Sequence, residues 1–283
     1  MSFENTIHAR AILLDTMSLE MCAASGSGHP TSAMSIGHLI AVLMYETMRW
    51  LPDEPTNATS DRLVLSEGHA VPAVYAAMAD IGATVEWNNE PVKLNFDHLK
   101  TLREDHSPLD GHPNPMEGVT FFDAATGSLG QGLSVAVGIC LSAIRNNKPF
   151  NTYVVLGDGE LQEGQVWEAA IYASNMKISN LCMIIDFNEL QVEGKSENAI
   201  EHFNLFERWN SHNWNTIEID GNNLNEIIDA FETFRKEDQR PTVIIAKTLP
   251  GKGVSFLEGI YSHQMFFSRK ASQYAVEELM NGK

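Results

Sequence analysis

The sequence predicts an α/β fold with a parallel sheet that helices cover on both faces. The first observation is that short apolar runs rich in β-branched residues alternate along the chain with longer segments of helical periodicity. The second is a hydrophobic content of 43% in 283 residues, which is enough to bury one substantial core. No internal repeat or low-complexity linker divides the chain. We therefore expect one domain over residues 1–283, with residues from roughly 249 to 283 as a C-terminal extension of it.

Each element follows from a local pattern. In the first helix, residues such as Ile7, Ala11 and Leu14 recur at three- and four-residue steps. The polar, proline-containing segment 83–126 is longer than most connections, and such segments are usually functional or carry short elements of their own. In chain order, the predicted elements are helices over 5–24 and 33–49, strand 62–66, helix 69–81, helix 130–146, strand 152–157, helix 162–177, strand 181–187, strand 216–220, helix 223–237 and strand 241–248.

Composition excludes several classes of partner. The net charge of −18 repels both nucleic acid and anionic membranes. The N-terminus lacks the features of a signal peptide, and no run is long enough to span a bilayer. Cys22, Cys140 and Cys182 lie in apolar stretches without metal-type spacing, which predicts buried thiols. We expect a soluble, cytoplasmic protein that binds neither nucleic acid nor membrane.

Polar residues follow two successive predicted strands. The strand over 152–157 leads into Gly157-Asp158-Gly159, and the next strand is followed by Asn188, 30 residues beyond Asp158. That distance fits one strand–helix–strand unit, which brings Asn188 beside Asp158. Carboxylate and amide oxygens suit Mg²⁺ or Ca²⁺ that bridges two phosphates. For Gly-Asp-Gly alone, an ordinary tight turn is the alternative.

Three histidines stand in glycine-containing loops. They are His29 in Gly-Ser-Gly-His-Pro, His69 in Ser-Glu-Gly-His-Ala and His112 in Gly-His-Pro. Imidazoles can bind oxygens and move protons near neutral pH, and three in one setting favour a functional role. Taken singly, each histidine can equally be a loop residue or a satisfied core group.

Together these segments resemble the thiamine diphosphate motif of the transketolase family. The resemblance covers nearly the whole chain, from Gly-His-Pro to Ser262-His263-Gln264. It implies that the side chains of Asp158 and Asn188 and the carbonyl of Leu190 hold Mg²⁺ or Ca²⁺. The cofactor-binding residues that it implies are His69, Gly127, Ser128, Leu129, Gly157, Asp158, Gly159, Asn188 and His263.

The resemblance also implies catalytic roles. His29, His112 and His263 would orient the donor sugar and relay protons. Glu163 would belong to a carboxylate chain that links two active sites across a dimer, although a glutamate at a helix start is the alternative. Similarly, Thr126–Gly132 can be a cofactor loop or simply a helix-capping turn.

Four departures from the family pattern affect these assignments. Ser128 replaces the proline of single-chain transketolases, as in the split, two-chain form. Gln264 stands where glycine is expected, and the connection before His263 is about one residue short. Glu67 replaces a residue that is often lysine in split transketolases, which bears on donor preference.

The resemblance implies the N-terminal subunit of a split transketolase. That enzyme is a transferase that moves a two-carbon ketol unit from a ketose or ketose phosphate to an aldose. A separate C-terminal subunit would supply the absent pyrimidine-binding domain in an α₂β₂ assembly. The alternatives are a transketolase for a modified sugar and a non-catalytic protein that binds thiamine diphosphate. A deoxyxylulose-phosphate synthase is disfavoured by length.

Overall fold

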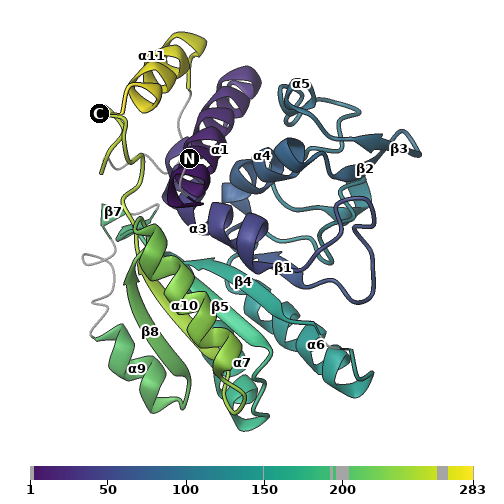
Figure 1. The fold of residues 1–283 in the computed structure, drawn as a ribbon, viewed down its shortest axis with the longest axis vertical. Helices are drawn as coiled ribbons and strands as arrows, with labels where there is room; N and C mark the ends of the chain where they lie inside the picture. The colour runs from purple at the N-terminus through teal and green to yellow at the C-terminus, as the bar shows by residue number, and fades with distance from the viewer. Residues whose placement is uncertain (1–2, 149, 192–193, 196–203, 260–266, 283) are drawn as a thin grey trace. The chain divides into compact units, whose positions relative to one another are not determined.

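The computed structural model describes residues 3–148, 150–191, 194–195, 204–259 and 267–282 (Figure 1). The chain divides into two compact units, of which unit 1 comprises residues 1–57, 68–125 and 249–283, and unit 2 comprises residues 58–67 and 126–248. Each unit combines segments that are distant in the sequence. That residues 1–283 form a single domain stays a prediction.

Unit 2 contains a five-stranded parallel sheet in the order β1-β4-β5-β9-β8. Its strands are β1 (Arg62–Leu65), β4 (Thr152–Gly157), β5 (Leu181–Phe187), β9 (Thr242–Lys247) and β8 (Asn215–Asp220). The predicted α/β fold with a parallel sheet is confirmed, and every predicted strand boundary is correct to within one residue.

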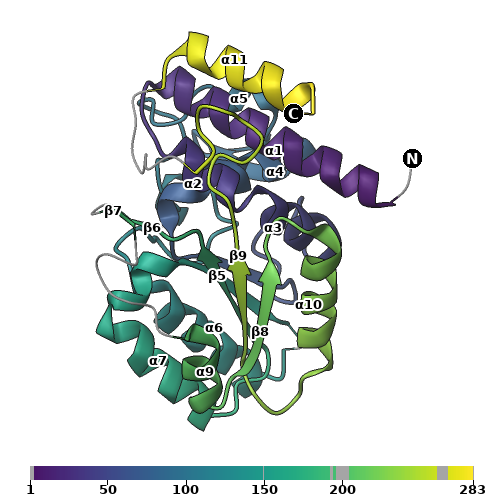
Figure 2. The same ribbon diagram turned by 90° about the vertical axis from the view of Figure 1, so that its left-hand side faces the viewer.

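Helices of unit 2 cover both faces of this sheet, as predicted. They are α6 (Gly132–Arg145), α7 (Gly164–Asn175), α9 (Leu205–Ser211) and α10 (Leu224–Lys236). Figure 2 shows α6, α7 and α9 on one side of the sheet and α10 on the other. Because successive side chains of a strand point to opposite faces, Val154 and Leu156 join the core under α6 and α7. Tyr153 instead meets Phe231 and Phe234 of α10, with ring centroids 5.9 and 5.6 Å away.

Unit 1 is built around the long helix α1, which packs against α3, α4 and α11. Its helices are α1 (Phe3–Ser25), α2 (Pro30–Ser35), α3 (Gly37–Val42), α4 (Val71–Ile81), α5 (Phe96–Leu99) and α11 (Arg269–Met280), with short helical turns at η1 (Leu43–Thr47), η2 (Gly68–Ala70) and η3 (Pro115–Glu117). Arg10 of α1 pairs with Asp80 of α4 and lies over the ring of Tyr45, whose hydroxyl donates to Asp80 at 2.9 Å. This cluster fixes α1 against its neighbours.

The prediction of one helix over 33–49 is wrong. The helix starts earlier, at Pro30, is interrupted at Ile36, and ends in a π-helical turn. A Cβ added at Gly37 would collide with the buried carboxyl of Asp15, so α3 can begin there only because residue 37 has no side chain. Packing against α1 therefore interrupts a segment whose periodicity looked continuous.

Other elements differ from the prediction at their ends or were not predicted. The predicted helix 162–177 becomes a 3₁₀ turn, η4 (Asp158–Gln162), followed by α7. Segment 83–126 carries elements of its own, as expected, among them the hairpin β2 (Thr84–Trp87) and β3 (Glu90–Lys93). Helices α9 and α11 and the ribbon β6 (Leu190–Gln191) with β7 (Gly194–Lys195) were not predicted.

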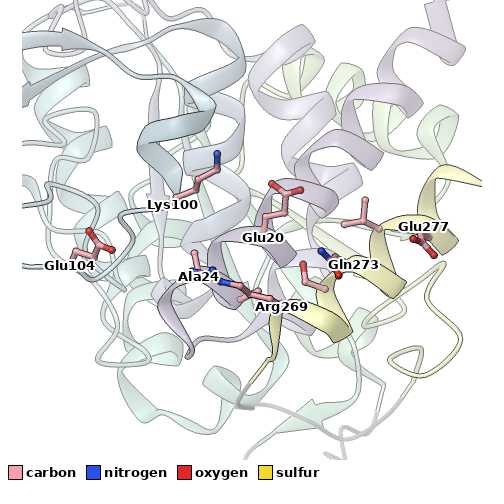
Figure 3. A pocket seen from close by; sticks show the side chains of 10 residues that line it. Glu20, Ala24, Lys100, Glu104, Arg269, Gln273 and Glu277 are labelled. Atoms are coloured by element: carbon pink, nitrogen blue, oxygen red, sulfur yellow. The ribbon is translucent and has the colours of Figure 1, made fainter.

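A groove of about 680 Å³ opens in unit 1 between α1, residues 100–104 and α11. Figure 3 shows Glu20, Lys100 and Arg269 among its lining side chains, so charges of both signs border it. None of the described site residues predicted from the sequence lines this groove.

Two further expectations concern the cysteines and membranes. All three cysteines are buried and free of disulfides, as predicted. Within the described ranges, no helix combines the length and the hydropathy that a bilayer crossing requires.

Candidate functional site

The carboxyl ends of β4 and β5 place Asp158 next to the segment that contains Asn188. The two strands pair with Gly157 opposite Asp186, so the chain leaves both strands at the same level. Asp158 is 1% exposed, and its Oδ2 accepts a hydrogen bond at 2.9 Å from the backbone N–H of Glu189. This bond holds the turn after β5 against the carboxylate at the end of β4.

Asn188 is oriented by a second buried carboxylate. Its side-chain nitrogen donates to Oδ2 of Asp186 at 2.6 Å, and the Thr248 hydroxyl donates to the other oxygen of Asp186. Because the nitrogen faces Asp186, the amide oxygen of Asn188 is directed away from it. Leu190 begins β6, which packs against η4, the turn that Asp158 opens.

These residues fit a hard divalent cation. A carboxylate, an amide oxygen and a backbone carbonyl are the oxygen donors that Mg²⁺ and Ca²⁺ prefer. Within the described residues, no group of three or more His, Cys, Asp or Glu side chains could hold a metal ion. A cation here would therefore depend on Asn188 and the Leu190 carbonyl together with Asp158, the set implied by the sequence.

Buried acids surround this position in unit 2. Glu67 is 1% exposed, and burial raises the pKa of its carboxyl, with further increases from the charges of Asp186, Glu160 and Asp158. The raised pKa of Glu67 favours the neutral acid. The cluster thus carries less negative charge than four carboxylates would.

The loop Thr126–Gly132 is attached to the end of β1. The Thr126 hydroxyl donates to the carbonyl of Leu65 at 2.6 Å, and the Gly132 N–H donates to the Ser66 hydroxyl at 3.2 Å. Gln131 at the N-cap of α6 makes no side-chain capping bond within the described part of the chain. The observed bonds therefore anchor the loop to the sheet, which a capping turn alone does not explain.

The predicted cofactor residues Gly127, Ser128 and Leu129 form the middle of this loop. Gly127 has φ of 125°, a conformation that a side chain would strain. Ser128 is exposed, and Leu129 is 38% exposed despite being a large apolar residue. An accessible leucine beside polar backbone suits contact with a ligand ring.

The two glutamates after Asp158 differ in their surroundings. Glu163 is exposed and stands at the N-cap position of α7, where its side chain caps none of the described N–H groups. A Cβ added at Gly130 would lie 2.6 Å from the Cβ of Glu163, so the loop lies directly against this residue. Glu160, by contrast, is 1% exposed and accepts three hydrogen bonds. Glu160 was not among the predicted site residues, although its place two residues after Asp158 was a signal.

Unit 1 brings two of the predicted histidines together. The rings of His29 and His69 have centroids 4.9 Å apart, and His29 is buried. Gly28 makes this turn possible, because its φ is 135° and an added Cβ would lie 2.8 Å from the sulfur of Cys22. The loop before α2 and the turn η2 are thereby fixed against each other.

Arg103 connects the loop of His29 with that of His112. Its guanidinium donates to the Ser27 hydroxyl at 2.8 Å, and its Nε occupies the space that a Cβ on Gly111 would need. No sequence pattern pointed to Arg103, which stands in a polar loop far along the chain from His29. His263 lies outside the described residues.

We expect His112 to be neutral at pH 7. Burial, and then the charge of Arg103, lower the pKa of His112 below its ordinary value of 6.5, whereas Asp110 opposes the shift. Because the folded chain binds this proton less readily than the unfolded chain, the contribution of His112 to stability is complete above pH 6.5 and declines as the pH falls below it.

NMR titration of the His112 ring checks this expectation. The wild-type midpoint should lie below pH 6.5, and Arg103→Ala should raise it. A midpoint at or above 6.5 in the wild type would contradict the assignment of burial as the main cause.

Comparison with known proteins places most of the chain in one family. The family model described as the transketolase thiamine diphosphate binding domain matches residues 7–265. The chain is 41% identical to the transketolase of Homo sapiens over 245 residues, which cover 85% of this chain and 36% of that protein. It thus spans little more than a third of this relative.

Two relatives have a length close to that of this chain. The 6-deoxy-6-sulfo-D-fructose transketolase subunit SqwG of Clostridium sp. (strain MSTE9) is 35% identical over 95% of this chain and 94% of its own. A subunit of the apulose-4-phosphate transketolase of Phocaeicola vulgatus is 34% identical over 86% and 82%, respectively.

Solved structures agree on the fold. The crystal structure of transketolase from Campylobacter jejuni has a TM-score of 0.88 and 30% identity, and the match covers 99% of this chain and 43% of that one. The transketolase of Leishmania mexicana has a TM-score of 0.87 at 25% identity, and the match covers 97% of this chain and 41% of that one.

Proposed function

This chain belongs to the transketolase family, and from that membership we propose that it is the diphosphate-binding subunit of a two-chain transketolase. The observation that carries the proposal is coverage. The chain accounts for 94% and 82% of two relatives that are named as subunits, but for only 36% of the human transketolase. A partner subunit would supply the remaining pyrimidine-binding domain.

The residues of unit 2 would bind the cofactor and a cation. Asp158, Asn188 and the carbonyl of Leu190 would hold Mg²⁺ or Ca²⁺ on the diphosphate, and the amide of Gly159 would bind a diphosphate oxygen. The loop at Gly127–Leu129 would line the organic part of the cofactor. Thiamine diphosphate, when bound, supplies the chemistry that breaks and remakes the carbon–carbon bond beside the ketose carbonyl.

The histidines of unit 1 would bind the diphosphate and the sugar. In this proposal His69 contacts the diphosphate, while His29, His112 and His263 bind the donor's carbonyl and hydroxyl oxygens and move protons. The lowered pKa of His112 supports its role, because a neutral imidazole can both accept and donate a hydrogen bond. Glu163 would connect the two active sites of a dimer.

A modified sugar is a second candidate donor. Transketolase structures from Pichia stipitis contain fructose 6-phosphate, whereas SqwG is named for 6-deoxy-6-sulfo-D-fructose. The two ketoses share the carbons at which a ketol unit is cut and differ in the anionic group at C6. The high coverage of SqwG by this chain supports including the sulfonated sugar.

Reconstitution tests the proposal. We expect the chain alone to show no ketol transfer with thiamine diphosphate and Mg²⁺, and to show transfer once its stoichiometric partner, purified from the source lysate, is added. The measurement is aldehyde release from fructose 6-phosphate and from 6-deoxy-6-sulfofructose with one aldose acceptor.

The outcomes separate the candidates. A preference of more than about tenfold for one donor, equivalent to about 1.4 kcal/mol, assigns the substrate class. Thiamine diphosphate binding by a partnerless chain, without turnover of either donor, would support the non-catalytic alternative. An active chain without a partner would contradict the two-chain assignment.

A further inference from the structure

We propose that Glu160 is a positioning residue that fixes the loop Thr126–Gly132 and the end of β4 in the geometry that thiamine diphosphate requires. Three segments of unit 2 converge on its carboxylate. Ser66 comes from the end of β1, Gly130 from the loop, and Gly157 from the last position of β4. The inference rests on the proposed function, because it assigns a role in the same cofactor site.

The hydrogen bonds use both carboxylate oxygens. Oε1 accepts from the Ser66 hydroxyl at 2.5 Å and from the Gly130 N–H at 2.7 Å, while Oε2 accepts from the Gly157 N–H at 3.1 Å. Ser66 is 94 residues from Glu160 in the sequence, and Gly130 is 30 residues away. One side chain therefore joins segments that have no covalent reason to stay together.

The site requires a carboxylate of this length. All three partners are donors, and a carboxylate is the side-chain group that offers two acceptor oxygens and no hydrogen. A glutamine has one oxygen, so its NH₂ group would face the Ser66 and Gly130 donors or the Gly157 N–H. An aspartate is shorter by one methylene and cannot reach all three. Glu160 is 1% exposed, so water cannot replace a lost partner cheaply.

The position of these bonds connects Glu160 to the cofactor. Gly130 immediately follows Gly127–Leu129, and its φ of 88° sets the direction in which the loop runs. Gly157 immediately precedes Asp158. The same carboxylate thus fixes the loop proposed to line the organic part of the cofactor and the backbone that leads to the proposed cation ligand. Glu160 would touch neither and would act through both.

Glu160→Gln tests the inference, with Glu232→Gln on α10 as a matched control. Glu232 undergoes the same change in the same unit, but its side chain is 54% exposed and pairs with Lys236 at 3.7 Å. With saturating Mg²⁺, we expect Glu160→Gln to weaken thiamine diphosphate binding to the full chain by about tenfold or more, as measured by calorimetry. The control should change affinity by less than about twofold.

Hydrogen exchange supplies a readout that does not need the cofactor. In the cofactor-free chain, the amides of Gly130 and Gly157 should exchange at least about tenfold faster in Glu160→Gln, while amides of α10 keep their protection. If wild-type chain binds no thiamine diphosphate, the proposed function fails, and unchanged exchange at both glycines would separately overturn the positioning role.

Two further measurements guard against a trivial loss of folding. Ser66→Ala removes one donor, and we expect it to weaken cofactor binding by a few-fold in wild type and by less in Glu160→Gln, since both changes act on one network. In the complex with the partner subunit, saturating thiamine diphosphate should restore kcat. Wild-type affinity in Glu160→Gln, or a kcat loss that saturation does not restore, overturns the inference. If Glu160→Gln fails to fold, Ser66→Ala alone decides, and an unchanged affinity there overturns it.

Discussion

Asp158→Ala should abolish the Mg²⁺-dependent binding of thiamine diphosphate to this chain. The substitution removes the proposed carboxylate ligand from a position that is 1% exposed. It also removes the acceptor for the Glu189 N–H, which holds the turn with Asn188 in place. Outer-shell changes at metal sites cost about 10–100-fold in affinity, so loss of a direct ligand should exceed about 100-fold.

Calorimetric titration with and without Mg²⁺ measures this effect. Asp229→Ala on the exposed side of α10 is the matched control, and it should leave affinity within about twofold. Normal Mg²⁺-dependent affinity in Asp158→Ala would remove Asp158 from the cation site. A comparable loss in Asp229→Ala would show that the assay reports general destabilisation.

Trp209→Ala should have the largest effect on stability. Trp209 is fully buried in unit 2, where it stacks on Trp167 with ring centroids 4.8 Å apart and meets Trp214 edge-on at 5.2 Å. Truncation of a buried tryptophan leaves a cavity and costs about 3–5 kcal/mol. Since a typical domain is stable by about 5–15 kcal/mol, this is a large share of the total.

Urea unfolding followed by circular dichroism measures the change in the free energy of unfolding. Tyr172→Ala on α7 is the control, because Tyr172 is 46% exposed and its loss should cost about 0.5 kcal/mol or less. A cost below about 1 kcal/mol for Trp209→Ala would contradict the packing of α9 onto the sheet.

The five strands of the sheet were predictable from the sequence. Each lies in a short run of apolar and β-branched residues, such as Leu181–Phe187, and a strand that is buried on both faces leaves that pattern whatever its neighbours are. The approach of Asn188 to Asp158 also followed, because parallel strands joined by one helix end at the same edge of the sheet.

Elements that depend on packing were harder to predict. The break at Ile36 depends on the Asp15 side chain of another helix, which local periodicity does not reveal. Helix α9 is only seven residues long and owes its place to the stacking of Trp209 with Trp167 and Trp214. Short helices are marginal on propensity alone, so tertiary contacts decide whether they form.

The sequence by itself determined the α/β class, the family and the residues proposed to bind the cation and the diphosphate. Those features depend on strand burial and on motifs of adjacent residues, both of which a sequence displays directly. Only the tertiary structure showed that Arg103 links the loops of Ser27 and Gly111 and that Glu160 accepts from Ser66, Gly130 and Gly157. The physical reason is that a buried polar side chain must find its partners wherever the fold brings donors together, and sequence spacing does not specify that place.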